Sequence, residues 1–460
     1  MLIAVDPTTG VELRRVEPAD EAGREEILAA AAAAAPPWRG ASFDRRGALL
    51  RGVAARLRAE RERLALLMCE EMGKPIREGR GEVDKAAWCA EHYAEHGEHY
   101  LATERLTSDA SSSYVQYLPL GPVLGILPWN APLWLAFRFC APALMAGNPC
   151  VMKHDPHVPG CAAAIGAIFD QEIAEHGAPA GVFINLPLAT EDVEEVIRDP
   201  RIRAVSFTGS DRGGAAVAAV AGSVIKPVVL ELGGSDPGIV LADADLDEAA
   251  RVLALSRIIN AGQSCIAAKR LLVEEPVYEP FVERLEAQLS AFRVGDPRSE
   301  QTDVGPIARG DLRRALAAQV EETVTAGARC LLGGEVPEGG GFFYPVTLLA
   351  EVPTDSAAFR EETFGPVAAV TRVGDAEEAI ELANDTPYGL GAGLWTQAAR
   401  GEAMARQIET GQVAVNGIVK TDPRLPSGGV KRSGYGRELG PHGIREFVNA
   451  QQVWVGPART

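Results

Sequence analysis

Two side chains near the middle of the sequence could together carry out covalent catalysis. Glu231 lies in Leu230-Glu231-Leu232-Gly233-Gly234, and Cys265 ends the run Asn260-Ala261-Gly262-Gln263-Ser264-Cys265. A cysteine is more often a buried apolar residue than a nucleophile. A thiolate combined with a carboxylate that activates water is nevertheless sufficient for covalent capture of a substrate followed by hydrolysis.

A second pattern could bind a dinucleotide. Val205-Ser206-Phe207-Thr208-Gly209-Ser210, followed by Gly213-Gly214, is typical of a strand that runs into a helix, whose free N–H groups could face a pyrophosphate. Taken alone, the pattern is more often only a tight strand-to-helix turn. No GxGxxG opens a helix, and the Gly73-Lys74 pair is followed by Pro75, which excludes a P-loop NTPase.

Composition limits the class of protein that could carry these residues. The 460 residues allow two or three domains, and 47% hydrophobic with 23% charged residues is ordinary for a soluble globular protein. A net charge of −18 disfavours nucleic acid as a partner. The seven cysteines include no CxxC pair, and no secretory signal opens the chain, so we expect a cytoplasmic protein without disulfides and without membrane association.

The first hundred residues have a helical pattern. We expect a helix through the alanine run 29–35 that ends at Pro36-Pro37, and an amphipathic helix over 45–72. His92, His96 and His99 share one helical face. A solvated face is the better interpretation of these histidines than a metal site, so no metal is expected.

From residue 114 onward, β-prone runs alternate with helical runs, which predicts an α/β fold with parallel sheets. The first series comprises strands over 123–127, 150–153, 182–186 and 204–208 and helices over 133–146, 160–175 and 191–197. The second comprises strands over 228–231, 239–241, 270–273 and 367–371 and a helix over 245–260. The run 334–341 reads as a surface loop, and the last β-prone run, 447–455, could pair with 114–118 or with a partner chain.

Six ordered motifs resemble the aldehyde dehydrogenase superfamily. Glu231 and Cys265 lie 34 residues apart, as the general base and the nucleophile do in that family, and the similarity runs from about Asp6 to Trp454. The motifs are Pro128-Trp129-Asn130, Lys153, Phe207 to Ser210, Glu231 to Gly234, Gly262 to Cys265, and Glu361 to Val367.

The resemblance implies roles for three catalytic residues. Cys265 would attack an aldehyde carbonyl, and Asn130 and the Cys265 backbone N–H would stabilise the oxyanion. After hydride transfer to a nicotinamide, water activated by Glu231 would hydrolyse the thioester. A coenzyme-A-acylating variant is disfavoured because it usually lacks this base.

The resemblance also implies NAD or NADP as cofactor. Glu362 would hold the nicotinamide ribose and Lys153 the adenine ribose. Pro156 stands where members that prefer NAD often have a glutamate, so NADP is possible and NAD is not excluded. The remaining cofactor residues by this comparison are Trp129, Gly209, Ser210, Gly214, Leu232 and Phe364.

Within the superfamily, the runs 153–162, 230–237 and 437–440 resemble the bacterial succinate-semialdehyde dehydrogenases of the Sad type. Arg138 matches an arginine that binds the substrate carboxylate, although a structural ion pair is the alternative. A second arginine found in some members is replaced by Ile259. Arg424 or Ser427 could substitute for it.

Other substrates and roles remain open at this point. Trp134, Phe137 and Phe139 would also suit an aromatic or apolar aldehyde, and another semialdehyde fits as well. A non-catalytic scaffold of the same fold is the remote alternative. The presence of Cys265, Glu231, Asn130 and Glu362 together argues against it, because a scaffold has no use for all four.

The expected architecture is a Rossmann-type α/β cofactor domain, an α/β catalytic domain and a small β oligomerisation arm. The cofactor domain would comprise residues 1–105 and 120–230, the catalytic domain 231–435, and the arm 106–119 and 436–460. By resemblance, the arm makes homodimers or homotetramers, and an isolated strand pair of this kind is marginal by itself.

Overall fold

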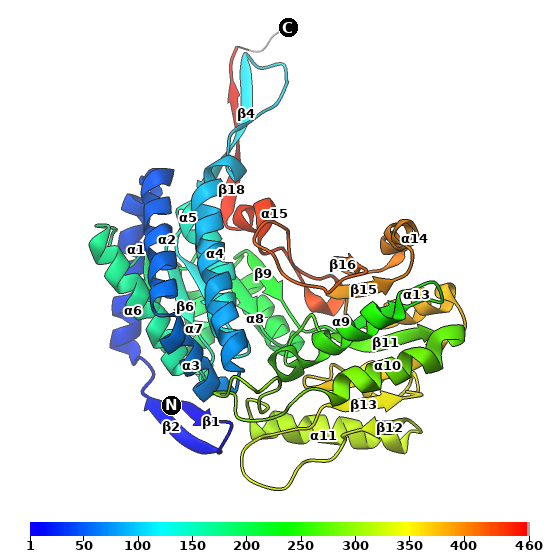
Figure 1. Cartoon of the computed structure of the whole chain (residues 1–460). Coiled ribbons are helices and arrows are strands. Elements are labelled where there is room, and N and C mark those ends of the chain that lie inside the picture. The colour runs from blue at the N-terminus through cyan, green and yellow to red at the C-terminus, as the bar shows by residue number, and fades with distance from the viewer. Residues whose placement is uncertain (458–460) are drawn as a thin grey trace.

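A computed structural model describes residues 1–457 of the chain, which fold into two large sheets, an N-terminal hairpin and a projecting arm (Figure 1). Residues 458–460, which the sequence assigned to the arm, lie outside the described residues. The hairpin joins β1 (Leu2–Asp6) to β2 (Val11–Val16). The prediction of an all-helical beginning is wrong here, because Leu2 and Ala4 turn inward with the two-residue period of a strand.

The first large sheet has the strand order β17-β9-β8-β5-β6-β7, with β17 antiparallel and the other strands parallel. β5 and β6 in its centre are buried on both faces, which explains their apolar runs. The sequence grouped β9 with the second series, but β9 is hydrogen-bonded to β8 in this sheet. The bounds are β5 Val123–Ile126, β6 Cys150–Lys153, β7 Phe183–Asn185, β8 Ala204–Thr208, β9 Val228–Glu231 and β17 Gly434–Tyr435.

Eight helices accompany this sheet, and α4 packs against α2, α3 and α5. The alanine-rich helix α1 does not end at Pro36 but continues to Arg39, because the φ angle of proline is compatible with a helix and its missing N–H is confined here to the last turn. The helix expected over 45–72 is divided at Glu60. The bounds are α1 Glu21–Arg39, α2 Phe43–Ala59, α3 Arg61–Met72, α4 Ile76–Tyr100, α5 Pro132–Ala146, α6 Pro159–Glu175, α7 Val193–Arg198 and α8 Asp211–Ser223.

The second large sheet has the order β12-β13-β14-β11-β10-β15-β16, and only β12 is antiparallel to its neighbour. Its strands are β10 Asp236–Val240, β11 Ala268–Glu274, β12 Arg329–Leu332, β13 Thr347–Ala350, β14 Val367–Val373, β15 Gly391–Trp395 and β16 Gln412–Val415. Its helices are α9 Leu246–Ile258, α10 Tyr278–Ser290, α11 Gly310–Thr325, α12 Ala357–Arg360, α13 Ala376–Asn384 and α14 Ala398–Met404.

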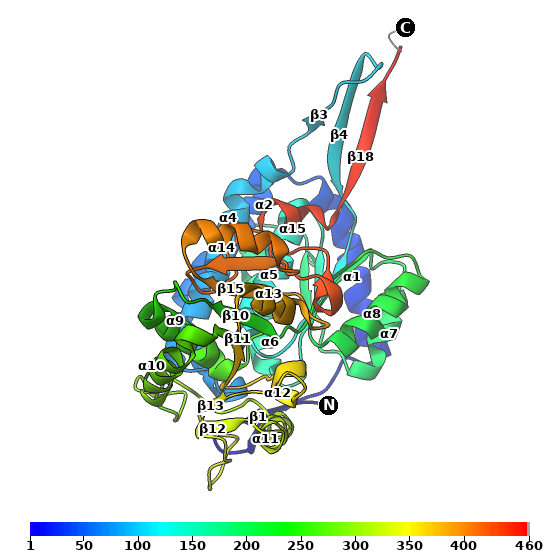
Figure 2. The same cartoon turned by 90° about the vertical axis from the view of Figure 1, so that its right-hand side faces the viewer.

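The arm is a three-stranded sheet of order β18-β4-β3 that projects from the body (Figure 2). β18 (Val448–Val455) pairs antiparallel with β4 (Ser112–Pro119) over its whole length, so the predicted pairing within the chain is confirmed. β3 (Glu104–Arg105) also pairs with β4 and precedes the expected boundary at residue 106. The short helix α15 (Gly440–Arg445) leads into β18 and packs on α4 and α5.

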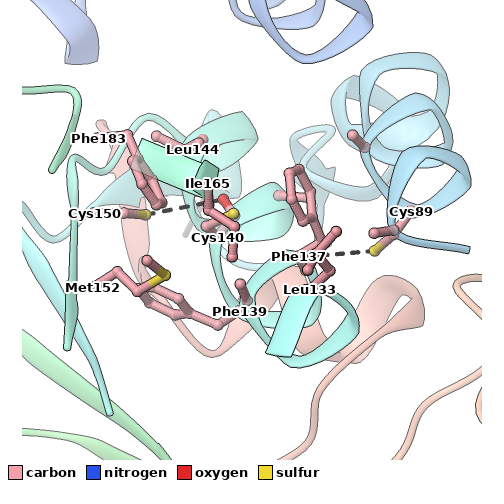
Figure 3. Packing of buried hydrophobic residues seen from close by; sticks show 14 of the residues in the cluster. Cys89, Leu133, Phe137, Phe139, Cys140, Leu144, Cys150, Met152, Ile165 and Phe183 are labelled. Carbon is pink, nitrogen blue, oxygen red and sulfur yellow. Dashed lines mark hydrogen bonds between the residues drawn. The ribbon is translucent and has the colours of Figure 1, made fainter. Parts of the chain in front are cut away.

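All seven cysteines are free thiols, and they range from buried to exposed. Cys89, Cys140 and Cys150 lie in the core of the first unit, where the Cys89 thiol donates to the backbone O of Phe137 at 3.5 Å (Figure 3). Helix α5 is buried along its length. None of the described helices is both long and apolar enough to cross a bilayer.

The histidine face on α4 differs from the prediction. His92 is buried rather than solvated, and its Nε2 lies 3.1 Å from the Tyr100 hydroxyl. Burial lowers the pKa of His92 to about 4, so the ring is neutral at physiological pH.

Candidate active site

The carboxyl ends of the parallel strands in the first sheet bring the predicted motifs to one edge. Lys153 ends β6, the turn with Trp129 and Asn130 follows β5, and Glu231 ends β9. Gly209 follows β8, which lies between β5 and β9. Ligands of open α/β sheets bind at this edge, where the strand order reverses.

The predicted nucleophile lies in a strained turn between α9 and β11. Asn260, Ala261 and Gly262 have φ angles of 56°, 54° and 73°, all in the left-handed region. A Cβ on Gly262 would lie 2.2 Å from the backbone O of Gly365, so the close approach of these two loops requires glycine. Strain of this kind is typical of functional sites because the surrounding structure must hold it in place.

Hydrogen bonds to three other segments hold this turn. The Asn260 side-chain Nδ2 donates to the backbone O of Asn130 at 2.8 Å, which joins the turn to the segment after β5. The Asn260 backbone N–H donates to Glu78 of α4 at 2.7 Å. The Gln263 side-chain oxygen accepts from the backbone N–H of Ala308 at 2.9 Å.

A buried ammonium lies beneath the nucleophile. Lys269 Nζ donates to the backbone oxygens of Ser264 at 2.9 Å and Cys265 at 2.7 Å. The same Nζ lies 3.3 Å from a carboxylate oxygen of Glu362, which also accepts from the backbone N–H of Gly234 at 3.1 Å. Lys269 therefore connects the nucleophile turn with the loop that carries the predicted ribose ligand.

The surroundings of Cys265 favour the protonated thiol. Burial raises its pKa to about 11, although the positive charges of Lys269 and Arg138 act in the opposite direction. Because the thiolate is the nucleophile, only a small fraction of Cys265 is reactive at neutral pH without further help.

Asn130, the predicted oxyanion donor, is held by hydrogen bonds. Its side-chain Nδ2 donates to the backbone O of Gln263 at 3.1 Å, and the amide carries a second hydrogen for a ligand. Its backbone O accepts from Lys74 at 3.0 Å. These bonds fix the amide beside Cys265, and both residues line one cavity.

Glu231 is a buried carboxyl with one partner. Its Oε2 accepts from Arg138 at 3.0 Å, while Oε1 has no hydrogen-bond partner among residues 1–457. Gly428 leaves the space beside Oε1, since a Cβ there would lie 2.6 Å from this oxygen. Burial raises the pKa of Glu231 to about 8, against the opposing charge of Arg138 and with the support of Glu438. An unpartnered buried oxygen of this kind suits a bound water.

Arg138 forms the structural ion pair that the sequence left as the alternative. Its Nη2 contacts Glu231, and its Nε lies 2.5 Å from a carboxylate oxygen of Glu438. The residue also lines the cavity with Cys265, and its Nη1 has no hydrogen-bond partner in the described part of the chain. The guanidinium charge is thus already shared between two carboxylates.

The cavity that holds Cys265 and Asn130 has a volume of about 350 Å³. Of the three aromatic residues considered from the sequence, only Trp134 lines it, whereas Phe137 and Phe139 are core residues. Other lining residues are Lys74, Glu78, Glu82 and Lys85 around α4, Ile259 before the nucleophile turn, and Ile418 to Thr421 after β16.

Sequence reasoning missed the contribution of α4. Glu78, Glu82 and Lys85 recur at intervals of four and three residues, which places them on one helical face. Glu82 accepts from the backbone N–H of Trp134 at 3.1 Å and forms an ion pair with Lys74. The helical spacing of these charges was the signal that could have found them.

Two predicted substrate residues do not line this cavity. Arg424 is largely exposed and forms a bidentate pair with Asp422, at 2.8 and 2.6 Å. Ser427 is buried, and its backbone exchanges two hydrogen bonds with Glu438. The idea that either one completes a carboxylate site has no support in this arrangement.

The residues predicted for the cofactor form a fitting cradle. Ser210 caps α8, its Oγ accepting from Gly213 at 3.2 Å, so the N-terminal N–H groups of a 13-residue helix point at the sheet edge. Gly214 packs against Leu232, and a Cβ there would lie 2.5 Å from its methyl group. The buried Thr208 hydroxyl, just before this turn, has no partner among residues 1–457.

The two ends of this cradle are also in place. Lys153 is buried and has neither an ion-pair nor a side-chain hydrogen-bond partner in the described part of the chain, with Pro156 in the loop that follows. Burial lowers the pKa of Lys153. At the other end, Phe364 packs edge-on against Trp129 with ring centroids 5.9 Å apart, next to Glu362. His154 is not free for a ligand, because its ring contacts the backbone O of Pro132 at 2.9 Å.

Comparisons with known proteins agree with this geometry. The model of the aldehyde dehydrogenase family matches residues 2–453. A probable succinate-semialdehyde dehydrogenase [NADP(+)] of Synechocystis sp. is 49% identical over 90% of each chain, and succinate semialdehyde dehydrogenase [NAD(P)+] Sad of Escherichia coli is 46% identical over 98% of this chain and 97% of its own. The crystal structure of succinic semialdehyde dehydrogenase from Streptococcus pyogenes with NADP+ superposes with a TM-score of 0.95 at 35% identity, covering 99% of this chain and all of the other.

Proposed function

The chain belongs to the aldehyde dehydrogenase family, and we propose that it oxidises succinate semialdehyde to succinate with NAD or NADP. The observation that carries the chemistry is one cavity lined by both Cys265 and Asn130. The choice of substrate comes from the relatives named above, because their names specify succinate semialdehyde.

The first half of the reaction takes place on Cys265. Its thiolate attacks the aldehyde carbon, a C–S bond forms, and the carbonyl oxygen becomes an oxyanion. The free hydrogen of the Asn130 amide and the Cys265 backbone N–H donate to that oxygen. NAD(P)+, when bound, would supply the oxidising equivalent by accepting the substrate hydrogen as a hydride, that is, two electrons and one proton.

The second half is hydrolysis of the resulting thioester. Glu231 takes a proton from water on its free Oε1, the water oxygen attacks the acyl carbon, and the C–S bond breaks to return the Cys265 thiolate. The structure has no hydrogen bond between Glu231 and Cys265 in its described residues, which is consistent with a base that acts through an intervening water.

The proposed cofactor residues lie along the cradle described above. We propose that the N-terminal turn of α8, with Gly209, Ser210 and Gly214, holds the pyrophosphate. Lys153, beside Pro156, binds the adenine ribose or its phosphate. At the other end, Glu362 binds the second ribose, and the residues around the nicotinamide are Trp129, Leu232 and Phe364.

The division into domains is part of the proposal. The first sheet serves as the cofactor unit over 1–105 and 120–230, and the second as the catalytic unit over 231–435. The arm joins subunits into a homodimer or homotetramer, which is supported by the exposed Trp454 and Val455 of β18. A reducing compartment, the cytoplasm, suits the free thiol of Cys265.

The test is the formation of NAD(P)H with purified protein. Succinate semialdehyde should give an absorbance rise with at least one of the two cofactors, and Cys265→Ala should abolish it. Absence of turnover across short semialdehydes with both cofactors, or full activity of Cys265→Ala, would refute the proposal.

An aromatic or apolar aldehyde is the second candidate. Trp134, Ile259 and Ile418 line the cavity and provide an apolar wall. A panel that includes benzaldehyde and butanal decides between the two, since this candidate requires a higher kcat/KM for the uncharged aldehydes than for succinate semialdehyde.

A further inference from the structure

The cavity contains four cationic side chains that could bind a substrate carboxylate. They are Lys74, Lys85, Arg138 and Lys420. A carboxylate in a partly buried site is held best by a cation whose charge is not already balanced by a neighbour. The partners of each cation therefore decide which one is available.

The positive charges of two of these four side chains are already balanced by neighbouring carboxylates. Lys74 forms a buried ion pair with Glu82 and also donates to Asn130. Arg138 lies between Glu231 and Glu438, so a substrate carboxylate there would be the third around one guanidinium. Its free Nη1 can donate a hydrogen bond, but it supplies little net positive charge.

Lys85 differs from both. Its Nζ donates to the Thr421 hydroxyl at 2.8 Å and lies 4.2 Å from the centre of the Trp134 ring. No carboxylate of residues 1–457 comes within ion-pair distance of it. The hydroxyl uses one of the three hydrogens on Nζ, and the aromatic face fixes the ammonium from a second side. Lys420 is exposed, so its charge is screened by solvent.

We propose that Lys85 binds the carboxylate of the substrate and sets the preference of the enzyme for ω-carboxylated aldehydes, with Thr421 and Trp134 positioning its ammonium. This inference rests on the proposed function, because it assigns the far end of the same substrate. It differs from the expectation for Arg138, which now keeps Glu231 in place and contributes at most one donor.

The surroundings of Lys85 agree with this assignment. Burial and the positive charge of Arg138 lower its pKa to about 8, while Glu82 and Cys89 on α4 and Asp422 in the following loop act in the opposite direction. The ammonium is thus charged at neutral pH and poorly compensated. A bound carboxylate would stabilise the charged form, so binding should weaken as pH rises above about 8.

The experiment compares succinate semialdehyde with its methyl ester, which has the same aldehyde and no charge. Lys85→Met should lower kcat/KM for the acid by about 10-fold or more and leave the ester nearly unchanged, whereas Lys85→Arg should retain most of the preference. Lys420→Met and Arg138→Met test the competing cations. Thermal unfolding of each variant reports whether the fold is retained.

A measurement on the unaltered enzyme covers the case in which Lys85→Met does not fold. The ratio of kcat/KM for the acid to that for the ester should fall above pH about 8, because Lys85 loses its proton while effects on Glu231 cancel in the ratio.

Three outcomes would each overturn the assignment of Lys85. They are an equal loss on both substrates in Lys85→Met, a selective loss only in Lys420→Met or Arg138→Met, and a ratio independent of pH. If the enzyme turned over the ester without preferring the acid, both the role of Lys85 and succinate semialdehyde as the substrate would be overturned, but aldehyde oxidation would stand. Inactivity on both compounds would refute the proposed function itself.

Discussion

At the scale of single residues, Glu231 combines a buried position with one free oxygen. Its pKa of about 8 means that it is mostly protonated at neutral pH and becomes a base as pH rises. Replacing it by glutamine keeps the shape and removes the base.

We expect Glu231→Gln to form one equivalent of NAD(P)H rapidly and then to turn over about 10²- to 10⁴-fold more slowly, because the thioester forms but is not hydrolysed. In the unaltered enzyme, thioester hydrolysis should accelerate with pH up to a plateau above about 8, and the variant should lack this rise. Stopped-flow absorbance across pH checks both. A variant without the initial burst would show that Glu231 acts before the thioester.

Lys269 gives a second prediction at this scale. Its ammonium lowers the pKa of Cys265, so Lys269→Met should raise that pKa above about 11 and slow alkylation of Cys265 by iodoacetamide at every pH below it. Lys226→Met is a matched control, since Lys226 also donates to two backbone oxygens but lies between α8 and β9, away from Cys265. Equal alkylation rates in Lys269→Met and the unaltered enzyme would contradict this role.

Sequence patterns can propose the residues of the site but not their partners. Cys265, Glu231 and Asn130 were predicted from short local motifs, and their roles stay predictions. Arg138 was expected to face the substrate, but its partner Glu438 is 300 residues away in the sequence. Only the folded chain shows that the two charges meet.

At the scale of elements, the turn before Cys265 depends on one glycine. Gly262→Ala should destabilise the protein by about 1–3 kcal/mol and reduce activity, because the residue has a left-handed φ and its Cβ would collide with Gly365. Urea denaturation and steady-state rates measure the two effects.

Gly222→Ala on α8 is the control for this substitution. A Cβ there meets nothing within 4 Å, so alanine should leave stability unchanged or raise it by about 0.5–1 kcal/mol. Similar stabilities of the two variants would mean that the turn adapts without cost.

Element prediction succeeded where a local pattern and the tertiary contacts agree. β6, β8 and β9 have their expected bounds, because each is a short apolar run that becomes a buried parallel strand. It failed at β1 and β2, whose hairpin is defined by pairing across a turn, and in α1, where the helix continues through Pro36. The membership of β9 in the first sheet depends on β8 and could not be inferred from β9 alone.

At the scale of the whole molecule, the arm extends beyond the body and carries exposed apolar side chains. If the arm joins subunits, replacing Trp454 and Val455 together by glutamate should shift the protein toward monomer, as measured by light scattering after size-exclusion chromatography. Val11→Glu with Leu13→Glu makes the same change on the exposed strand β2 and should leave the mass unchanged. A monomer in the unaltered protein would contradict the premise.

The net charge of −18 is a property of the whole molecule and affects how it attracts ligands. Both proposed ligands are anions, so the field of the whole protein does not attract them. Their binding must rest on local positive groups such as Lys153, Lys85 and the N-terminus of α8.

The cradle along the sheet edge is supported by two different sheets: Lys153 ends a strand of the first, while Glu362 and Lys269 belong to segments of the second. An engineer could therefore retune the choice between NAD and NADP by substitutions at Pro156 without touching the scaffold beneath Cys265. The two halves of the protein could then be altered separately, one to change the choice of cofactor and the other to change the chemistry at Cys265.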